Sequence, residues 1–302
     1  MGIAVKTFNN GEVIINEGDS GKSIFRLVEG NADVIADYGT KEPFRLAVLK
    51  AGDYFGEMSI FEEYPRSATV VAASSNVRVI EIPGDELNEF FKENPDVIGE
   101  LIDHLGNKIR TMTNDYNEAK ALLKNLQEAD SGKKKSLFSK IKKHIDMYQS
   151  GKDAITEPDE DAIRNAYAGI SSEEKINTET YKKGAVIFYE GEPNSCMYIL
   201  HGGNVGIYTG FGEKNEQQSA VLGPGSVFGE KGIMADDSMS YTAVAGSDDT
   251  LAEKIYMEDL KMIFRSSPAK INFILRYLCY RLRRLNNDFL RTCKEITENY
   301  NK

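Results

Sequence analysis

The chain has 302 residues, a length that favours two domains over one. Its hydrophobic content of 41% and charged content of 28% are typical of a soluble globular protein, and no apolar run is long enough to span a membrane. A net charge of −10 disfavours a protein that grips nucleic acid along its length. The three widely spaced cysteines argue against a disulfide framework or a zinc site. We therefore expect a cytoplasmic protein with no membrane span, no nucleic-acid partner and no metal site.

An internal repeat with a fixed offset of 173 residues organises the chain. The segment FNNGEVIINEGD, beginning at Phe8, aligns with YKKGAVIFYEGE, beginning at Tyr181. In the same register, VLKAGDYFGE at Val48 aligns with VLGPGSVFGE at Val221. Chance does not keep one ungapped register over about a hundred residues, so the sequence predicts a duplicated domain.

Each copy begins with short β-branched and aromatic runs that are separated by Gly, Asn and Asp turns. This pattern predicts a small antiparallel barrel or jelly roll. After Asn94-Pro95, and again in the second copy, apolar residues recur with the 3.6-residue period of a helix. The predicted fold class is mainly β with α, namely two double-stranded β-helix (jelly-roll) barrels, each followed by a long amphipathic helix.

The first long helix is predicted from Pro95 to about Glu128, which at 1.5 Å per residue gives a length of roughly 50 Å. Such a helix has more apolar surface than its own barrel can cover. We expect the remainder to be covered by the other copy or by a second chain, as in a homodimer. The arginines of the last helix are expected on its solvated face: Arg276, Arg281, Arg283, Arg284 and Arg291.

The predicted domains are a first copy over residues 1–130, a helical linker over 131–176 and a second copy over 177–302. The linker segment GKKKSLFSKIKKHI predicts a short basic amphipathic helix. That helix either binds an anionic membrane surface or a partner, or packs between the domains with its lysines solvated. The acidic residues from Glu157 to Asp161 are candidate partners for these lysines, and DEDAIRNAYAG predicts a short helix before the second barrel.

Two glycine-rich segments imitate phosphate-binding loops. NEGDSGKS, from Asn16 to Ser23, is followed by a strand pattern and not by a helix, and GPGSVFG, from Gly223 to Gly229, has the wrong spacing. Both are interpreted as turns in which glycine permits a positive φ. The histidines are isolated in the sequence and are assigned surface or packing roles: His104, His144 and His201. With no catalytic set apparent, we expect a protein that is not an enzyme.

The segment FGEMSIFEEYPRSATV, from Phe55 to Val70, combines a carboxylate and a guanidinium within a strand-rich region. The Glu57 carboxylate is a natural acceptor for a ribose 2′-hydroxyl, and the fork of Arg66 matches phosphate oxygens. We expect a short helix to begin at Met58, where its free amides add partial positive charge. Together these groups suit a cyclic phosphate fused to ribose. An internal Glu57–Arg66 salt bridge without a ligand is the alternative.

The whole pattern resembles the cyclic-nucleotide-binding domain family over roughly 8–116 and 181–290. The barrel pattern, the GDYFGE corner and the PRSATV return carry the resemblance. The first copy is similar to the sensor domain of bacterial catabolite activator proteins, and the tandem layout to regulatory subunits of cAMP-dependent protein kinase. The resemblance implies that Glu57 binds the ribose 2′-hydroxyl and that Arg66 binds the cyclic phosphate. It also implies ligand contacts at Phe55, Gly56, Met58, Ser59, Ser67 and Ala68, and a base contact at Thr113.

The second copy departs from this pattern at the phosphate. It keeps Glu230 but has Met239 at the register position of Arg66 and Tyr241 at that of Ala68. Methionine cannot neutralise a phosphate, and an unpaired buried charge is costly. The second copy is therefore predicted to be degenerate, with Lys231 as a substitute cation as the alternative.

These observations predict a cyclic-nucleotide sensor that binds cAMP or cGMP in its first copy, needs no cofactor and signals by helix rearrangement to a separate effector protein. Ser67 after the arginine favours cAMP by resemblance. A scaffold with an empty pocket is one alternative. A transcription regulator of the catabolite activator type is disfavoured because Lys133 to Ile176 holds no helix-turn-helix pattern. A kinase regulatory subunit would need a docking segment, and seven residues precede Phe8.

Overall fold

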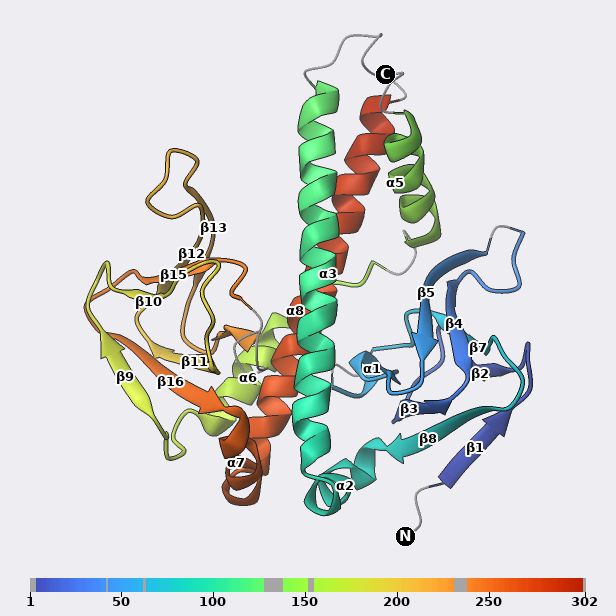
Figure 1. Cartoon of the computed structure of the whole chain (residues 1–302), viewed down its shortest axis with the longest axis horizontal. Helices are drawn as coiled ribbons and strands as arrows, with labels where there is room; N and C mark the ends of the chain where they lie inside the picture. Colours follow the sequence, from blue (N-terminus) through green and yellow to red (C-terminus); the bar gives the residue numbers. More distant parts are fainter. Residues whose placement is uncertain are drawn as a thin grey trace. The chain divides into compact units, whose positions relative to one another are not determined.

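The computed structural model describes residues 4–41, 43–61, 64–127, 138–151, 155–230 and 238–300 (Figure 1). The chain divides into two compact units. Unit 1 comprises Met1–Leu87, Lys108–Pro158 and Cys279–Lys302, and unit 2 comprises Asn88–Asn107 and Asp159–Leu278. Two of the boundaries, between Asn107 and Lys108 and between Leu278 and Cys279, fall inside long helices.

The first copy forms two four-stranded antiparallel sheets in unit 1. The strand order is β1-β8-β3-β6 in one sheet and β2-β7-β4-β5 in the other. The strands are β1 (Ala4–Phe8), β2 (Val13–Ile15), β3 (Ser23–Glu29), β4 (Asn31–Ala36), β5 (Phe44–Lys50), β6 (Tyr54–Phe55), β7 (Thr69–Ala72) and β8 (Val77–Pro83).

The second copy repeats this topology in unit 2, with the strand orders β14-β11-β16-β9 and β10-β15-β12-β13. Its strands are β9 (Thr178–Tyr181), β10 (Val186–Phe188), β11 (Cys196–Gly202), β12 (Val205–Thr209), β13 (Gln217–Leu222), β14 (Val227–Phe228), β15 (Thr242–Ala245) and β16 (Thr250–Tyr256). Even side-chain contacts recur, since Glu17 N donates to Thr69 Oγ1 at 3.0 Å and Glu190 N donates to Thr242 Oγ1 at 3.0 Å. The predicted duplication and jelly-roll class are confirmed. Over the described ranges each copy is a pair of sheets and not one closed barrel.

The cores of the two copies lie at the same register positions. Leu27 and Leu200 are fully buried, and the aromatic rings of Phe55 and Phe228 lie in the corresponding clusters. The strands β7 and β15 are buried on both faces, since all four residues of each are buried. The 173-residue register therefore places corresponding side chains in the core of both copies.

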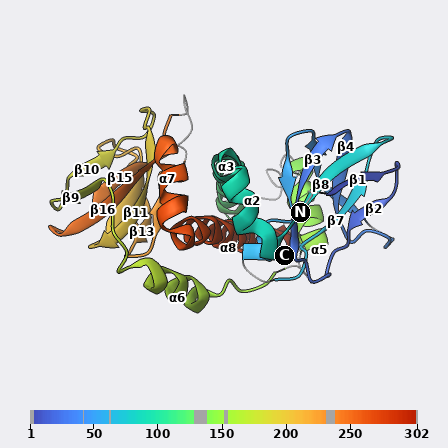
Figure 2. The same cartoon turned by 90° about the horizontal axis from the view of Figure 1, so that it is seen from below.

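Helices follow the sheets in both copies. The first copy continues through η1 (Gly84–Glu86) and α2 (Leu87–Glu93) into α3 (Asp96–Gln127). The second continues through η4 (Met257–Asp259) and α7 (Leu260–Ser266) into α8 (Pro268–Tyr300). Figure 2 shows that α2 leads into α3 and that α7 leads into α8. The prediction of α3 is confirmed, although Glu128 lies outside the described residues.

The C-terminal halves of α3 and α8 pack together with α5 (Phe138–Gly151) in unit 1. The buried side chains of this helix cluster are Ala119, Leu122, Leu126, Ile141, Phe289, Leu290, Cys293 and Ile296. The apolar surface of α3 packs against the linker helix and against α8, a helix of the second copy, which agrees with the first of the two expected alternatives. Within unit 1, α5 buries its apolar face and exposes Lys140, Lys142 and Lys143, which fits the packing alternative for the linker. Lys133–Leu137 lie outside the described residues.

The short helix predicted before the second copy is α6 (Glu160–Ile170). Asp159 is its N-cap, and its carboxylate accepts a hydrogen bond from Ala162 N at 2.9 Å. An N-cap carboxylate satisfies an amide that has no partner in the first helical turn. This contact explains why the helix begins at the acidic segment.

Candidate functional site

The predicted phosphate segment of the first copy is a turn between two strands. It leaves β6 at Phe55, passes through Gly56 with φ of +78°, forms the four-residue helix α1 (Met58–Phe61) and returns to β7. The positive φ requires glycine at position 56, because other residues rarely adopt it. The turn carries Glu57 and Arg66 into the interior, where they are 1% and 6% exposed. Glu62 and Glu63 lie outside the described residues.

The guanidinium of Arg66 is held by three acceptors. Nη1 donates to Gly56 O at 2.5 Å and to Ser59 Oγ at 2.6 Å, and Nη2 donates to Ser23 O at 2.7 Å. Burial lowers the pKa of Arg66, and the carboxylates of Glu57, Glu81 and Asp19 act in the opposite direction. Because arginine keeps its proton in proteins, the site contains a fixed positive charge.

Two residues that the sequence did not mark shape the arginine site. The Arg66 guanidinium lies 5.6 Å from the centre of the Phe25 ring, which stacks on Phe55 at 5.2 Å. A Cβ added at Gly21 would lie 2.0 Å from Arg66 Nε, so only glycine leaves room for the guanidinium there. Gly18 has the positive φ predicted for this turn, at +81°. For Gly21 that interpretation is wrong, because its role is close approach to Arg66.

The Glu57 carboxylate forms a salt bridge with Lys108 on α3, with Nζ 2.8 Å from Oε1. Lys108 was not predicted, because its partner lies 51 positions away and its neighbours give no signal of the contact. Glu57 also stabilises the charge of Arg66 electrostatically. The ligand-free internal pair therefore stays open as an alternative, with Lys108 and Ser59 added to the contacts of the two charges.

The remaining predicted ligand residues differ in burial and in hydrogen bonding. Ser59 is buried and donates its hydroxyl hydrogen to Gly56 O at 3.0 Å. Met58 is partly buried, Ala68 is buried and Ser67 is exposed. Thr113 lies on α3, where its hydroxyl donates to Ile109 O at 2.7 Å. Phe55, Ser59 and Ala68 are thus buried like the two charged residues of their segment, and the base contact of Thr113 stays a prediction.

In the second copy the same turn is closed by its own side chains. Gly229 has φ of +72° and its N–H donates to the hydroxyl of Tyr241 at 2.9 Å, while Met239 is 2% exposed. Asn194, at the register position of Gly21, donates through Nδ2 to Cys196 O at 2.6 Å. Cys196 O is the counterpart of Ser23 O, which Arg66 binds in the first copy. Lys231, the alternative cation, lies outside the described residues.

A buried charged network distinguishes the second copy further. Glu253 accepts hydrogen bonds from His201 Nε2 at 2.8 Å and from Lys270 Nζ at 2.9 Å, and Tyr167 contacts His201 Nδ1 at 3.1 Å. Burial raises the pKa of Glu253, but the hydrogen bonds from His201, Lys270 and Ile176 N outweigh it and hold the pKa below 4.5. The hydrogen bonds of His201 agree with the surface or packing role predicted for it, and they add partners that the sequence did not indicate.

Two other expectations about charged residues are also resolved. Arg283 on α8 is 5% exposed, so its predicted solvated position is wrong. Glu157, expected to pair with the linker lysines, forms a salt bridge with Arg291.

Among the side chains that the structure describes, no group of three or more His, Cys, Asp or Glu residues is arranged to hold a metal ion. No helix within the described ranges is long and apolar enough to cross a membrane.

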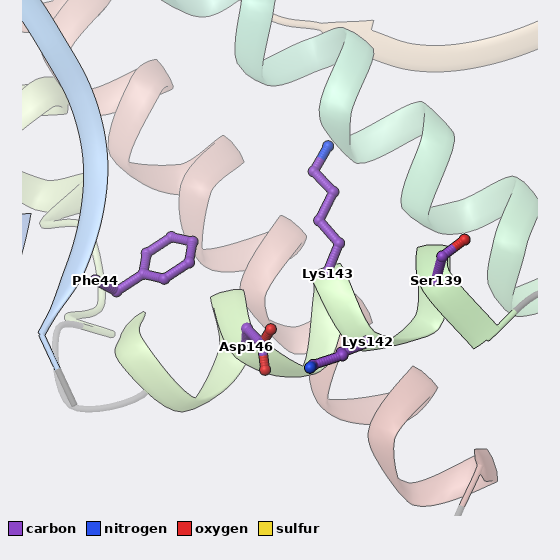
Figure 3. Close-up of a pocket in the computed structure, with 5 residues that line it drawn as sticks. All are labelled: Phe44, Ser139, Lys142, Lys143 and Asp146. Carbon is purple, nitrogen blue, oxygen red and sulfur yellow. The ribbon is translucent and has the colours of Figure 1, made fainter.

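An open hollow of about 400 Å³ lies elsewhere in unit 1, between the start of β5 and α5. Figure 3 shows Phe44 on the strand side and the side chains of Lys142, Lys143 and Asp146 on the helix side, with Ser139 one turn away. It shares no residue with the segment from Phe55 to Ala68. The hollow is therefore separate from the candidate site.

The profile of the cyclic nucleotide-binding domain matches residues 5–94 and 178–267, which is more than half of the chain. The chain therefore belongs to the cyclic nucleotide-binding domain family. The two matches lie inside the predicted domains 1–130 and 177–302, whose outer boundaries stay a prediction.

Individual relatives are distant. The chain is 23% identical over 238 residues to a cGMP-dependent protein kinase of Plasmodium berghei, covering 79% of this chain and 21% of the relative. It is 22% identical over 246 residues to a cAMP-dependent protein kinase regulatory subunit of Colletotrichum orbiculare, covering 79% and 50%. It is 31% identical over 103 residues to the cyclic AMP receptor protein of Thermus thermophilus, covering 34% and 47%. The chain thus spans half or less of the length of these curated relatives.

Solved structures give similar matches. The regulatory domain of Toxoplasma gondii protein kinase A with cAMP matches with a TM-score of 0.28 and 18% identity, covering 89% of this chain and 86% of that one. The Thermus thermophilus catabolite activator protein matches with a TM-score of 0.32 and 24% identity, covering 42% and 64%. The sequence relatives, and not these structures, confirm the resemblance to catabolite activator proteins and kinase regulatory subunits.

Proposed function

We propose that this chain is a regulatory sensor that binds one cyclic nucleotide in its first copy and none in its second. The observation that carries the proposal is the buried, charged guanidinium of Arg66, which lies in the same turn as the buried carboxylate of Glu57. A cyclic nucleotide presents a phosphate anion and a ribose hydroxyl as one rigid unit. Such a ligand complements both charges at once.

Binding would exchange contacts that the protein now makes with itself. Phosphate oxygens would compete with Gly56 O and Ser23 O for the hydrogens of Arg66, and a charged acceptor forms the stronger bond. The ribose 2′-hydroxyl would donate to Glu57, which is now held by Lys108 of α3. Because Lys108 belongs to the helix, this exchange would alter the restraint on α3 and supplies a physical route for the proposed helix rearrangement.

The ligand is proposed to be cAMP in preference to cGMP. Ser67 follows the arginine where cGMP-selective members of the family often place threonine, and Ser67 is exposed. The output is proposed to pass to a separate effector protein. The role is regulatory and not catalytic, in keeping with the similarity to kinase regulatory subunits.

Titration calorimetry with cAMP and with cGMP tests the proposal on the wild type, on Arg66→Ala and on Met239→Ala. We expect heat with cAMP from the wild type and from Met239→Ala, which changes the matching position of the second copy. Arg66→Ala should bind at least about 30-fold more weakly, because truncating one partner of a buried charge pair costs about 2–5 kcal/mol. A stoichiometry of two, or equal loss in both variants, would contradict the assignment to the first copy.

The second candidate is a scaffold with an empty first copy. It is favoured by the fact that Arg66 already donates to acceptors of the protein itself. The same titration decides between the two, since a scaffold gives no heat with either nucleotide.

A further inference from the structure

Tyr64 lies in the segment between β6 and β7, here called the phosphate turn, and contacts other parts of unit 1. It lies two residues before Arg66 and is partly buried. The guanidinium of Arg283 on α8 lies 4.3 Å from the centre of its ring, and its hydroxyl donates to Glu157 O at 2.6 Å. A cation over an aromatic face is attracted by the ring quadrupole, and the attraction is strengthened when the pair is desolvated. Arg283 is 5% exposed, so this contact is largely sheltered from water.

The segment Thr156–Glu157, which accepts the hydrogen bond from the Tyr64 hydroxyl, also contacts α8. The Glu157 carboxylate forms a salt bridge with Arg291, and Thr156 O accepts a hydrogen bond from Asn287 Nδ2 at 2.7 Å. Arg283, Asn287 and Arg291 are spaced four residues apart and therefore share one face of α8. One face of α8 thus contacts both the ring of Tyr64 and the segment Thr156–Glu157, whose Glu157 carbonyl accepts the hydrogen bond from the Tyr64 hydroxyl.

The chain between Tyr64 and Arg66 is stiff. A single residue, Pro65, separates the two, and the proline ring fixes its φ. The backbone of Arg66 is anchored on both sides, because its N–H donates to Asp19 O at 2.9 Å and its carbonyl accepts from Gly18 N at 2.8 Å. The backbone at Arg66 therefore moves only together with the turn at Gly18 and Asp19, and Tyr64 shares any such shift through Pro65.

We infer that Tyr64 couples occupancy of the phosphate site to α8, so that ligand binding at Arg66 alters the packing of the helix face Arg283–Arg291. This inference rests on the proposed function of the first copy and adds its route of output. Arg283 and Tyr64 are positioning residues here, because neither is a member of the proposed ligand set. The C-terminal half of α8 also belongs to the helix cluster with α3 and α5, so a change at this face reaches all three helices.

Hydrogen exchange of α8 peptides, measured by mass spectrometry with and without saturating cAMP, tests the coupling. The variants are Tyr64→Leu, Tyr64→Phe and Arg283→Leu, and the matched control is Tyr38→Leu, which changes an exposed tyrosine of the same copy. In the wild type and the control, cAMP should change the exchange of residues 283–291. In Tyr64→Leu and Arg283→Leu we expect that change to be at least about fivefold smaller, the lower end of typical coupling between sites. Tyr64→Phe keeps the ring and should give an intermediate response.

Calorimetry on the same variants separates this inference from the proposed function. Absence of cAMP binding by the wild type would overturn both. If the wild type binds but its α8 peptides do not respond, or if Tyr64→Leu and Arg283→Leu respond as the control does, the coupling is overturned and the sensor is not. Thermal unfolding identifies a variant that fails to fold, and because the two leucine variants approach the contact from opposite sides, either one suffices for the decision.

Discussion

Arg66 and Met239 occupy the same backbone position in the two copies, but the first side chain is a cation and the second is apolar. Arg66 N donates to Asp19 O at 2.9 Å, and Met239 N donates to Glu192 O at 2.9 Å. The stacked rings behind them match as well, at 5.2 Å for Phe25 and Phe55 and at 5.0 Å for Tyr198 and Phe228. The backbone and core of the turn are therefore independent of the charge that the first copy places there.

The difference is confined to a few side chains that change together. Where the first copy has Gly21, Arg66 and Ala68, the second has Asn194, Met239 and Tyr241. The Tyr241 hydroxyl accepts from Gly229 N, and Asn194 Nδ2 donates to Cys196 O, so both backbone groups have a partner within the second copy. Loss of the arginine alone would have left Cys196 O, the counterpart of the acceptor Ser23 O, without a donor.

The largest effect on this comparison is expected from Glu253→Gln in the second copy. At the corresponding positions the first copy has Ile80, Val28 and Val97 in place of Glu253, His201 and Lys270. Removing one member of a buried ion pair leaves the other charged, so we expect a loss of about 3–5 kcal/mol in the free energy of unfolding. Urea denaturation measures it. The triple variant His201→Val, Glu253→Ile, Lys270→Val should recover most of the loss, and a triple variant as unstable as Glu253→Gln would contradict the account.

The same network predicts a dependence on pH. The pKa of Glu253 is lowered in the folded protein from its ordinary value of 4.5. Its contribution to stability is therefore present above about pH 4.5 and is lost as the pH falls through the lowered pKa. The difference in unfolding free energy between wild type and Glu253→Gln should shrink as the pH is lowered below 4.5. A difference that grows on acidification would have the wrong sign.

The next effect is expected from Ala68→Tyr, which brings the tyrosine of the second copy into the first. Its ring would occupy the place proposed for the phosphate, as Tyr241 does beside Gly229. We expect affinity for cAMP to fall about 100-fold, equivalent to about 2.7 kcal/mol. Calorimetry measures the loss, with Ala68→Ser as the control that keeps a small side chain. Undiminished binding by Ala68→Tyr would show that the phosphate does not lie there.

A smaller effect is expected from Tyr241→Phe, which removes only the hydroxyl that closes the second copy. Gly229 N then loses its acceptor in a buried site, and an unsatisfied buried donor costs about 1–3 kcal/mol. Urea denaturation should report this loss, whereas Tyr189→Phe at an exposed position should change little. Equal effects from the two variants would remove the argument that the hydroxyl replaces an external ligand.

The smallest effect is expected at α6, the cap of a helix that precedes the second copy. Asp159→Ala removes the acceptor of Ala162 N and should cost about 1 kcal/mol of stability. Asp159→Asn should be close to the wild type, because asparagine caps helices about as well as aspartate. A loss in Asp159→Asn as large as in Asp159→Ala would mean that the charge, and not the cap, matters at this end of the helix.

Local patterns in the sequence determined the repeated fold and the centre of the candidate site. The 173-residue offset, the strand alternation and the helical period after Pro95 depend on near neighbours along the chain, so they can be read without coordinates. Glu57 and Arg66 were found for the same reason, because they lie in one short turn. Met239 and Tyr241 followed from the register.

Only the tertiary structure supplied the partners of these residues. Lys108 meets Glu57 and Arg283 meets Tyr64 because long helices return to the turn, and His201, Glu253 and Lys270 meet across strands and a helix. The two members of such a pair are separated along the chain by a number of residues that differs from pair to pair, so no sequence pattern indicates the contact. A buried charge is stable only next to its counter-charge, and which counter-charge lies within reach is decided by packing and not by order along the sequence.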